Sequence, residues 1–117
     1  MRDHKELDVW IESVDVVTNV YSLTRNFPKE EIYGLTSQIR RAAVSIPSNI
    51  AEGAARQTEK EFIHFLYISL GSTAELETQI IIAKKLNFVS EVDDLLKHVT
   101  TVQKMLHGLI RHYRNKV

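Results

Sequence analysis

Apolar residues recur at alternating steps of three and four along most of this chain, a spacing that places them on one face of an α-helix. The rhythm is clearest near the carboxyl end, where it runs through Val92, Leu95, Val99, Val102, Leu106, Leu109 and Tyr113. No segment alternates apolar and polar residues for long enough to form a β-strand. The sequence therefore predicts an all-α protein.

Three earlier segments have the same helical spacing. The first ends before Pro28, and its predicted core seam is Leu7, Trp10, Val14, Val17, Tyr21 and Thr24. The second extends over about residues 34–55, with a predicted core seam of Leu35, Ile39, Ala42, Ile46 and Ile50. The third extends over about residues 58–86. Together with the last segment, they predict four helices.

Capping residues mark several helix ends. Thr58 and Glu61 have the spacing of a capping box at the start of the third helix, and Asn87 is the predicted stop. Ser90 with Asp93 predicts a cap at the start of the fourth helix. The connections between the helices are short, so consecutive helices must pack antiparallel. We therefore expect an up-down-up-down antiparallel four-helix bundle that forms a single domain over residues 1–117.

Pro47 lies inside the second helix, where proline removes a backbone donor and crowds the carbonyl of Ala43, at a cost of about 3 kcal/mol. Either the helix breaks and Ser48 caps a new piece, or it continues with a kink. We favour a kinked, continuous helix, because most neighbouring residues are small and broken pieces would be too short to match the other helices. The bend is expected to nest against Ser69, Gly71 and Ser72 of the third helix.

The third helix carries more apolar surface than one bundle can bury, because its apolar residues point in almost every direction. In one interpretation the bundle is compact and these residues are half-covered. We favour a second, in which the chain assembles as a homo-oligomeric ring through its second and third helices. The apolar and small residues of this predicted interface are Pro47, Phe65, Ile68, Gly71 and Ile81.

The chain has 15 Lys plus Arg and 15 Asp plus Glu, so nucleic-acid binding would require a local excess of positive charge. The last helix has such a ridge, about 26 Å long, opposite its core seam. Its candidate nucleic-acid-binding residues are Lys97, Lys104, His107, Arg111 and Arg114, with Lys116 beyond. Two alternatives remain: these cations complement the helix dipole, or Asp8, Glu12 and Asp15 of the first helix neutralise them. Neutralisation is favoured for one subunit, whereas a ring would repeat the ridge and multiply weak contacts.

The sequence predicts a non-enzymatic protein without a cofactor. It has no cysteine, which excludes disulfides, thiolate nucleophiles and Cys-ligated zinc and is typical of a reducing cytoplasm. Glu61 and His64 have the Glu-x-x-His spacing of di-iron bundles, but the chain holds one copy where such a site needs two, so the metal-oxidase alternative is disfavoured. The charged amino end and the absence of a long apolar segment predict a cytoplasmic protein with no membrane association.

Three stretches resemble a known family: "LDVW", "FPKEEIYGLTSQIRRAAVSIPSNIAEGAAR" and "FLYISLGSTAELETQI". They are similar to the small four-helix-bundle proteins encoded in intervening sequences of bacterial 23S ribosomal RNA genes, over about residues 7–88. The accessory variability protein of diversity-generating retroelements is also similar; it is a basic pentamer that associates with nucleic acid and a reverse transcriptase. This chain differs from that protein in being neutral.

The resemblance implies a homopentamer, with five bundles around one axis. It also implies that the matched positions serve mainly folding and assembly, namely Arg40, Arg41, Asn49, Glu52, Gly53, Gly71 and Glu75. From the residues alone, Arg40, Arg41 and Glu52 belong equally well to a solvated helix face or to a subunit boundary. The leading hypothesis is a scaffold that binds RNA or a ribonucleoprotein through the charged ridge. The alternative is a protein-protein interaction module that binds no nucleic acid.

Overall fold

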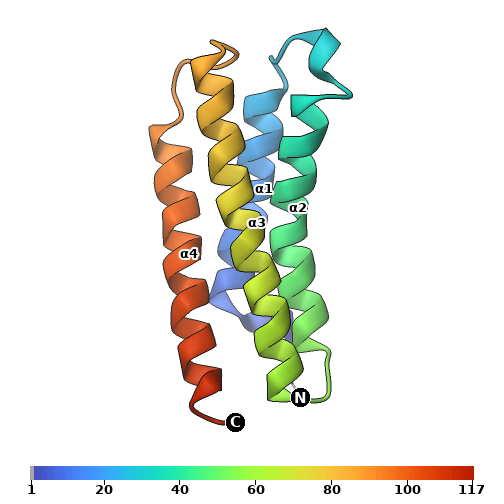
Figure 1. Cartoon of the computed structure of the whole chain (residues 1–117), viewed down its shortest axis with the longest axis vertical. Coiled ribbons are helices and arrows are strands. Elements are labelled where there is room, and N and C mark those ends of the chain that lie inside the picture. Colours follow the sequence, from blue (N-terminus) through green and yellow to red (C-terminus); the bar gives the residue numbers. More distant parts are fainter. Residues whose placement is uncertain (1) are drawn as a thin grey trace.

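The computed structural model describes residues 2–117, which form four α-helices and two short 3₁₀ helices and contain no β-strand (Figure 1). The elements in chain order are η1 (His4–Glu6), α1 (Asp8–Thr24), η2 (Lys29–Glu31), α2 (Leu35–Ala54), α3 (Glu59–Lys85) and α4 (Asp93–Arg114). The all-α prediction is confirmed, and the boundaries of the second and third helices agree with the sequence patterns. None of the helices formed by residues 2–117 combines the length and apolar character that a bilayer crossing requires.

The four long helices form an antiparallel bundle. Each packs against two others: α1 and α3 both contact α2 and α4. Consecutive helices run in opposite directions, so that both ends of the described chain lie at the same end of the molecule (Figure 1). This is the up-down-up-down arrangement that the short connections predicted.

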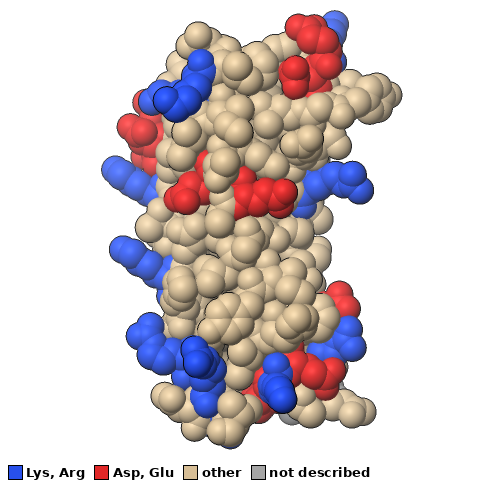
Figure 2. Space-filling model, viewed as in Figure 1, with Lys and Arg blue, Asp and Glu red and all other residues tan. Residues whose placement is uncertain are grey.

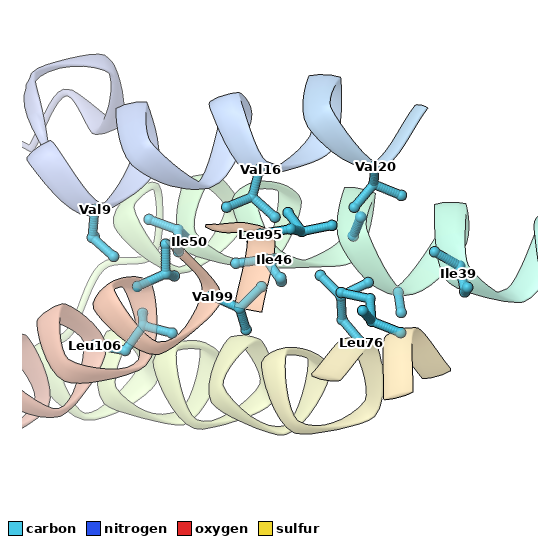
Figure 3. Close-up of a cluster of buried hydrophobic side chains, with 14 of the residues drawn as sticks. Val9, Val16, Val20, Ile39, Ile46, Ile50, Leu76, Leu95, Val99 and Leu106 are labelled. Atoms are coloured by element: carbon cyan, nitrogen blue, oxygen red, sulfur yellow. The ribbon is translucent and has the colours of Figure 1, made fainter. Parts of the chain in front are cut away.

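The core lies along the bundle axis, where apolar side chains from all four helices point toward one another (Figure 3). The predicted seams of α2 and α4 are largely confirmed, since Ile39, Ile46 and Ile50 are completely buried and so are Val99 and Leu106. Near the end of α4 the core shifts by one residue. Ile110 is buried there, while Leu109 and Tyr113 pack at the edge.

The predicted seam of α1 was correct at Thr24 and wrong by one residue over the rest of the helix. The buried residues are Val9, Ser13, Val16, Val20 and Thr24, whereas Tyr21 is 40% exposed and Val14 and Val17 are half-buried. Tyr21 instead lies beside Arg40, whose guanidinium is 4.5 Å from the centroid of the Tyr21 ring. The Arg40 Nε also donates a hydrogen bond to Thr24 Oγ1 over 2.9 Å, which ties α2 to the end of α1.

Two of the predicted helix caps are confirmed and one is wrong. Thr58 Oγ1 accepts a hydrogen bond from the Glu61 N–H at the start of α3. Asn87 has a φ of 62°, and the N–H groups of residues 87 and 88 close a Schellman motif on the last turn. Ser90 does not cap α4. That helix begins after Val92, which is buried in the core, and the Glu91 carboxylate accepts the Asp93 N–H.

Pro47 lies inside α2, which continues without interruption from Leu35 to Ala54. The broken-helix alternative is therefore wrong. Beside the proline, α3 approaches closely: Ser69 Oγ donates to the Ile46 carbonyl over 2.9 Å, and Ser45 Oγ lies 2.6 Å from Ser72 Oγ. The expectation that this part of α2 nests against small residues of α3 holds for the two serines.

Gly71 departs from that expectation. It is exposed, and a Cβ built on it would meet nothing within 4 Å. The glycine that permits close packing of α2 on α3 is Gly53, where a Cβ would lie 2.6 Å from Phe65 Cβ and 3.3 Å from the Phe62 carbonyl oxygen. Residue 53 therefore has no room for a side chain beside α3 near the α2–α3 turn.

Arg2 fastens the amino end to the α2–α3 turn. Its Nη1 forms an ion pair with Glu59 Oε1 at 2.8 Å, and its Nη2 donates to the Arg56 carbonyl at 3.2 Å. The guanidinium also lies 4.3 Å from the centroid of the Phe62 ring. Arg2 therefore satisfies a carbonyl beyond the end of α2 and covers one end of the core.

Candidate nucleic-acid and assembly surfaces

The ridge on α4 consists of Lys97, Lys104, His107, Arg111 and Arg114, with Lys116 just beyond the helix, and all six residues are exposed. Their spacing places them on one side of α4. In Figure 2, Lys and Arg side chains project at intervals along the edge of the molecule that α4 forms. We call this surface the α4 ridge.

Ion pairs within residues 2–117 leave the lysines and arginines of the α4 ridge unpaired. The basic partners of all four pairs are Arg2, Arg56 and His98. Glu12 of α1, expected to neutralise the ridge, instead lies with its Oε1 2.8 Å from His98 Nε2. No ion pair in this part of the chain joins the ridge to Asp8 or Asp15.

A groove of about 560 Å³ lies where the lower half of the α4 ridge meets α3. Its lining residues are Tyr67, His107, Ile110, Arg111, Arg114 and Asn115. Tyr67 comes from α3 and is 45% exposed, and its hydroxyl accepts a hydrogen bond from Arg114 Nη1 over 3.2 Å. No carboxylate lines the groove, so its electrostatic character is positive.

Several polar residues expected at a subunit boundary contact their own protomer. Arg40 bridges α1 and α2 as described above, and the Asn49 amide donates to the Ser45 carbonyl over 2.8 Å. Glu52 pairs with Arg56 one turn later at 2.8 Å. Arg41 and Glu75 are exposed and belong to none of the ion pairs of residues 2–117.

The apolar residues expected at that boundary differ in exposure. Pro47 is buried and Phe65 is half-buried, whereas Ile68 is 39% exposed and Ile81 is 41% exposed. At 100° per residue, Ile68 and Ile81 are about 140° apart around α3. They therefore lie on two opposite flanks of its outward side. Figure 2 shows uncharged surface between the acidic side chains at mid-height of the molecule and the charged side chains at the lower end of α3.

Comparison with known protein families shows where the chain belongs. Residues 5–108 match the family described as 23S rRNA-intervening sequence protein. The chain belongs to that family. In this intervening sequence protein, the match spans all of α1, α2 and α3 and most of α4.

A solved structure has the same fold. It is the 1.70 Å crystal structure of a protein of unknown function from the S23 ribosomal protein family of Bacteroides thetaiotaomicron VPI-5482. The two chains superpose with a TM-score of 0.78 at 22% sequence identity, over 87% of this intervening sequence protein and 97% of the other chain. No curated protein matches the sequence.

In this intervening sequence protein, both side chains of the Glu-x-x-His segment contact neighbouring residues of the bundle. Glu61 belongs to the cap of α3 and lies 3.9 Å from Arg56, and the ring of His64 packs edge-on against Phe65 with centroids 5.6 Å apart. Within residues 2–117 no three His, Asp or Glu side chains group in a way that could hold a metal ion. Sequence reasoning missed Tyr67, because only tertiary packing brings it to the α4 ridge.

Proposed function

We propose that this intervening sequence protein is a non-enzymatic, homo-oligomeric scaffold that binds RNA or a ribonucleoprotein in the cytoplasm through the α4 ridge. The observation that carries the proposal is the run of exposed ridge cations without a carboxylate partner among residues 2–117. Unpaired cations spaced along a helix attract phosphates and release the counterions that the phosphates hold. The neutral total charge limits each bundle to this local attraction, which repetition around a ring would multiply.

Binding to a structured RNA should weaken steeply with salt. Neutralising two ridge residues, Lys104→Gln with Arg111→Gln, should lower affinity for all sequences alike and reduce the slope of log K against log salt by about two. The measurement is fluorescence anisotropy at about 50 mM and about 200 mM salt. The matched control, Arg25→Gln with Lys29→Gln, removes the same charge from exposed positions at the other end of the bundle.

Three results would contradict the proposal. The wild-type protein could fail to bind at low salt, its binding could be indifferent to salt, or the control pair could weaken binding as much as the ridge pair. Circular dichroism of both variants checks that the helices are retained. Retention is expected, because Lys104 and Arg111 make no ion pair within the described chain.

Assembly is the second part of the proposal. Ile68 and Ile81 lie on opposite flanks of α3, and a ring requires two different surfaces on each subunit, because each copy meets two neighbours. We infer that the Ile68 flank of one copy packs against the Ile81 flank of the next, with α2 bent at Pro47 so that the flanks can meet. The number of copies, five, comes from the family resemblance.

Charged substitutions on each flank should disrupt the ring. Ile68→Glu and Ile81→Glu are each expected to run as monomers in light scattering, because a carboxylate would be buried in an apolar contact. An equimolar mixture of the two variants should form one-to-one dimers, since one intact flank remains on each. Ile11→Glu is the control, because Ile11 is 44% exposed on α1, away from both flanks. A monomeric wild type, or a mixture that stays monomeric, would contradict this arrangement.

The exposed apolar flanks also support the alternative, a module that binds another protein and no nucleic acid. The two functions differ in what the ridge substitutions do. If the ridge variant and the wild type form the same assembly, and neither binds RNA at low salt, the interaction module replaces the scaffold.

A further inference from the structure

The groove between α3 and α4 contains an aromatic residue that a surface binding only the phosphates of a nucleic acid would not need. Arg111 and Arg114 supply guanidinium groups on one wall. Tyr67, a residue that is 45% exposed, supplies an aromatic ring on the other wall. A site that binds only phosphates needs the cations and no aromatic ring. An exposed aromatic ring beside them adds a flat apolar surface on which a nucleobase can stack.

We propose that this groove binds one unpaired nucleotide of a single-stranded nucleic acid, with its phosphate on Arg111 and Arg114 and its base on the ring of Tyr67. The proposal rests on the nucleic-acid binding proposed above and adds the class of nucleic acid and the residue on α3.

The hydrogen bond between Arg114 and Tyr67 supports this arrangement. Cations in the last turn of a helix commonly complement the helix dipole by approaching their own carbonyl groups. Arg114 instead donates to the Tyr67 hydroxyl, across the groove. Because that hydroxyl accepts through a lone pair, its own proton remains available to donate to a phosphate oxygen.

Positive charge continues from the groove along α3. Lys60 precedes Tyr67 by two helical turns, which places it on the same side of α3 about 10 Å away. It is exposed and makes no ion pair within residues 2–117. A strand entering the groove could therefore extend toward Lys60 with its next phosphate.

A duplex would use this groove poorly. Base pairing and stacking hide the faces of the bases, so that Tyr67 could not contact them, whereas an unpaired base can be splayed onto an aromatic side chain. The groove should therefore favour single strands over duplexes of the same sequence. Stacking and phosphate contacts do not depend on the 2′-hydroxyl, so single-stranded DNA should bind as well as RNA.

The test compares a single strand of about 12 nucleotides with its own duplex, as RNA and as DNA, at low salt. The ratio of single-strand to duplex affinity should fall about tenfold in Tyr67→Ala, and Tyr67→Phe should recover most of it because the ring is restored. Tyr33→Ala is the control, since Tyr33 is 96% exposed in the α1–α2 connection. Circular dichroism confirms that each variant is folded.

The outcomes separate the two proposals. A ratio that falls in Tyr67→Ala and recovers in Tyr67→Phe supports the nucleotide site. If the wild type binds single strands and duplexes equally, or if Tyr67→Ala leaves the ratio unchanged, the nucleotide site is wrong while the α4 ridge remains. If the wild type binds none of the oligonucleotides at low salt, both proposals are wrong.

Discussion

Gly53→Val should lower the free energy of unfolding by about 3 kcal/mol or more, a large part of the roughly 5 to 15 kcal/mol that stabilises a typical domain. The reason is space. Even a single Cβ at residue 53 would lie 2.6 Å from Phe65 Cβ and 3.3 Å from the Phe62 carbonyl oxygen, so α2 and α3 would have to separate at their turn. Backbone freedom is not involved, because Gly53 has no positive φ.

The control for this prediction is Gly108→Ala in α4. A Cβ there would meet nothing within 4 Å, so alanine should stabilise the helix by about 0.5 to 1 kcal/mol. Urea unfolding, followed by circular dichroism at one protein concentration, measures both changes. Equal stability of Gly53→Val and the wild type would show that the α2–α3 contact is looser than described.

Phe62→Ala should cost about 4 kcal/mol. Phe62 is completely buried, its ring meets Tyr113 edge-on with centroids 4.9 Å apart, and the Arg2 guanidinium covers its face. Truncation would leave a cavity between α3 and α4 and would also remove the surface on which Arg2 rests. The large effect therefore combines lost burial with a lost cation–π contact.

Tyr33→Ala removes an aromatic ring of similar size from a site that is 96% exposed, so its effect should stay within about 0.5 kcal/mol. The same urea experiment compares the two variants. A loss below about 1 kcal/mol in Phe62→Ala would mean that the neighbouring side chains collapse into the space.

The fold was largely predictable because the periodicity of α2 and α4 admits one core face. In α1, two valine stripes offset by one residue compete, through Val16 and Val20 or through Val14 and Val17. Spacing cannot choose between them. The sequence pattern placed Tyr21 in the core, whereas in the structure it lies at the edge beside Arg40.

The α4 ridge could be predicted from the sequence because its residues repeat on one side of one helix. The small residues were assigned with mixed success: Gly53, one of the small residues expected to allow close approach, makes such a contact, whereas Gly71 is open. Arg2 and Tyr67 carry no local signal, since each acts on residues more than 40 positions away in the chain. Such contacts depend on the register between helices, which a single sequence does not reveal.

One buried polar contact helps to fix the register between α2 and α3. The hydroxyl of Ser69 is fully buried and reaches the carbonyl oxygen of Ile46. Sliding α3 along α2 by one turn, about 5.4 Å, would strand this hydroxyl away from its acceptor in a dry interior. Apolar helix surfaces can pack in several registers, whereas this hydrogen bond can form in only one of them. Ser69 therefore contributes less to the strength of the contact between α2 and α3 than to the choice of their register.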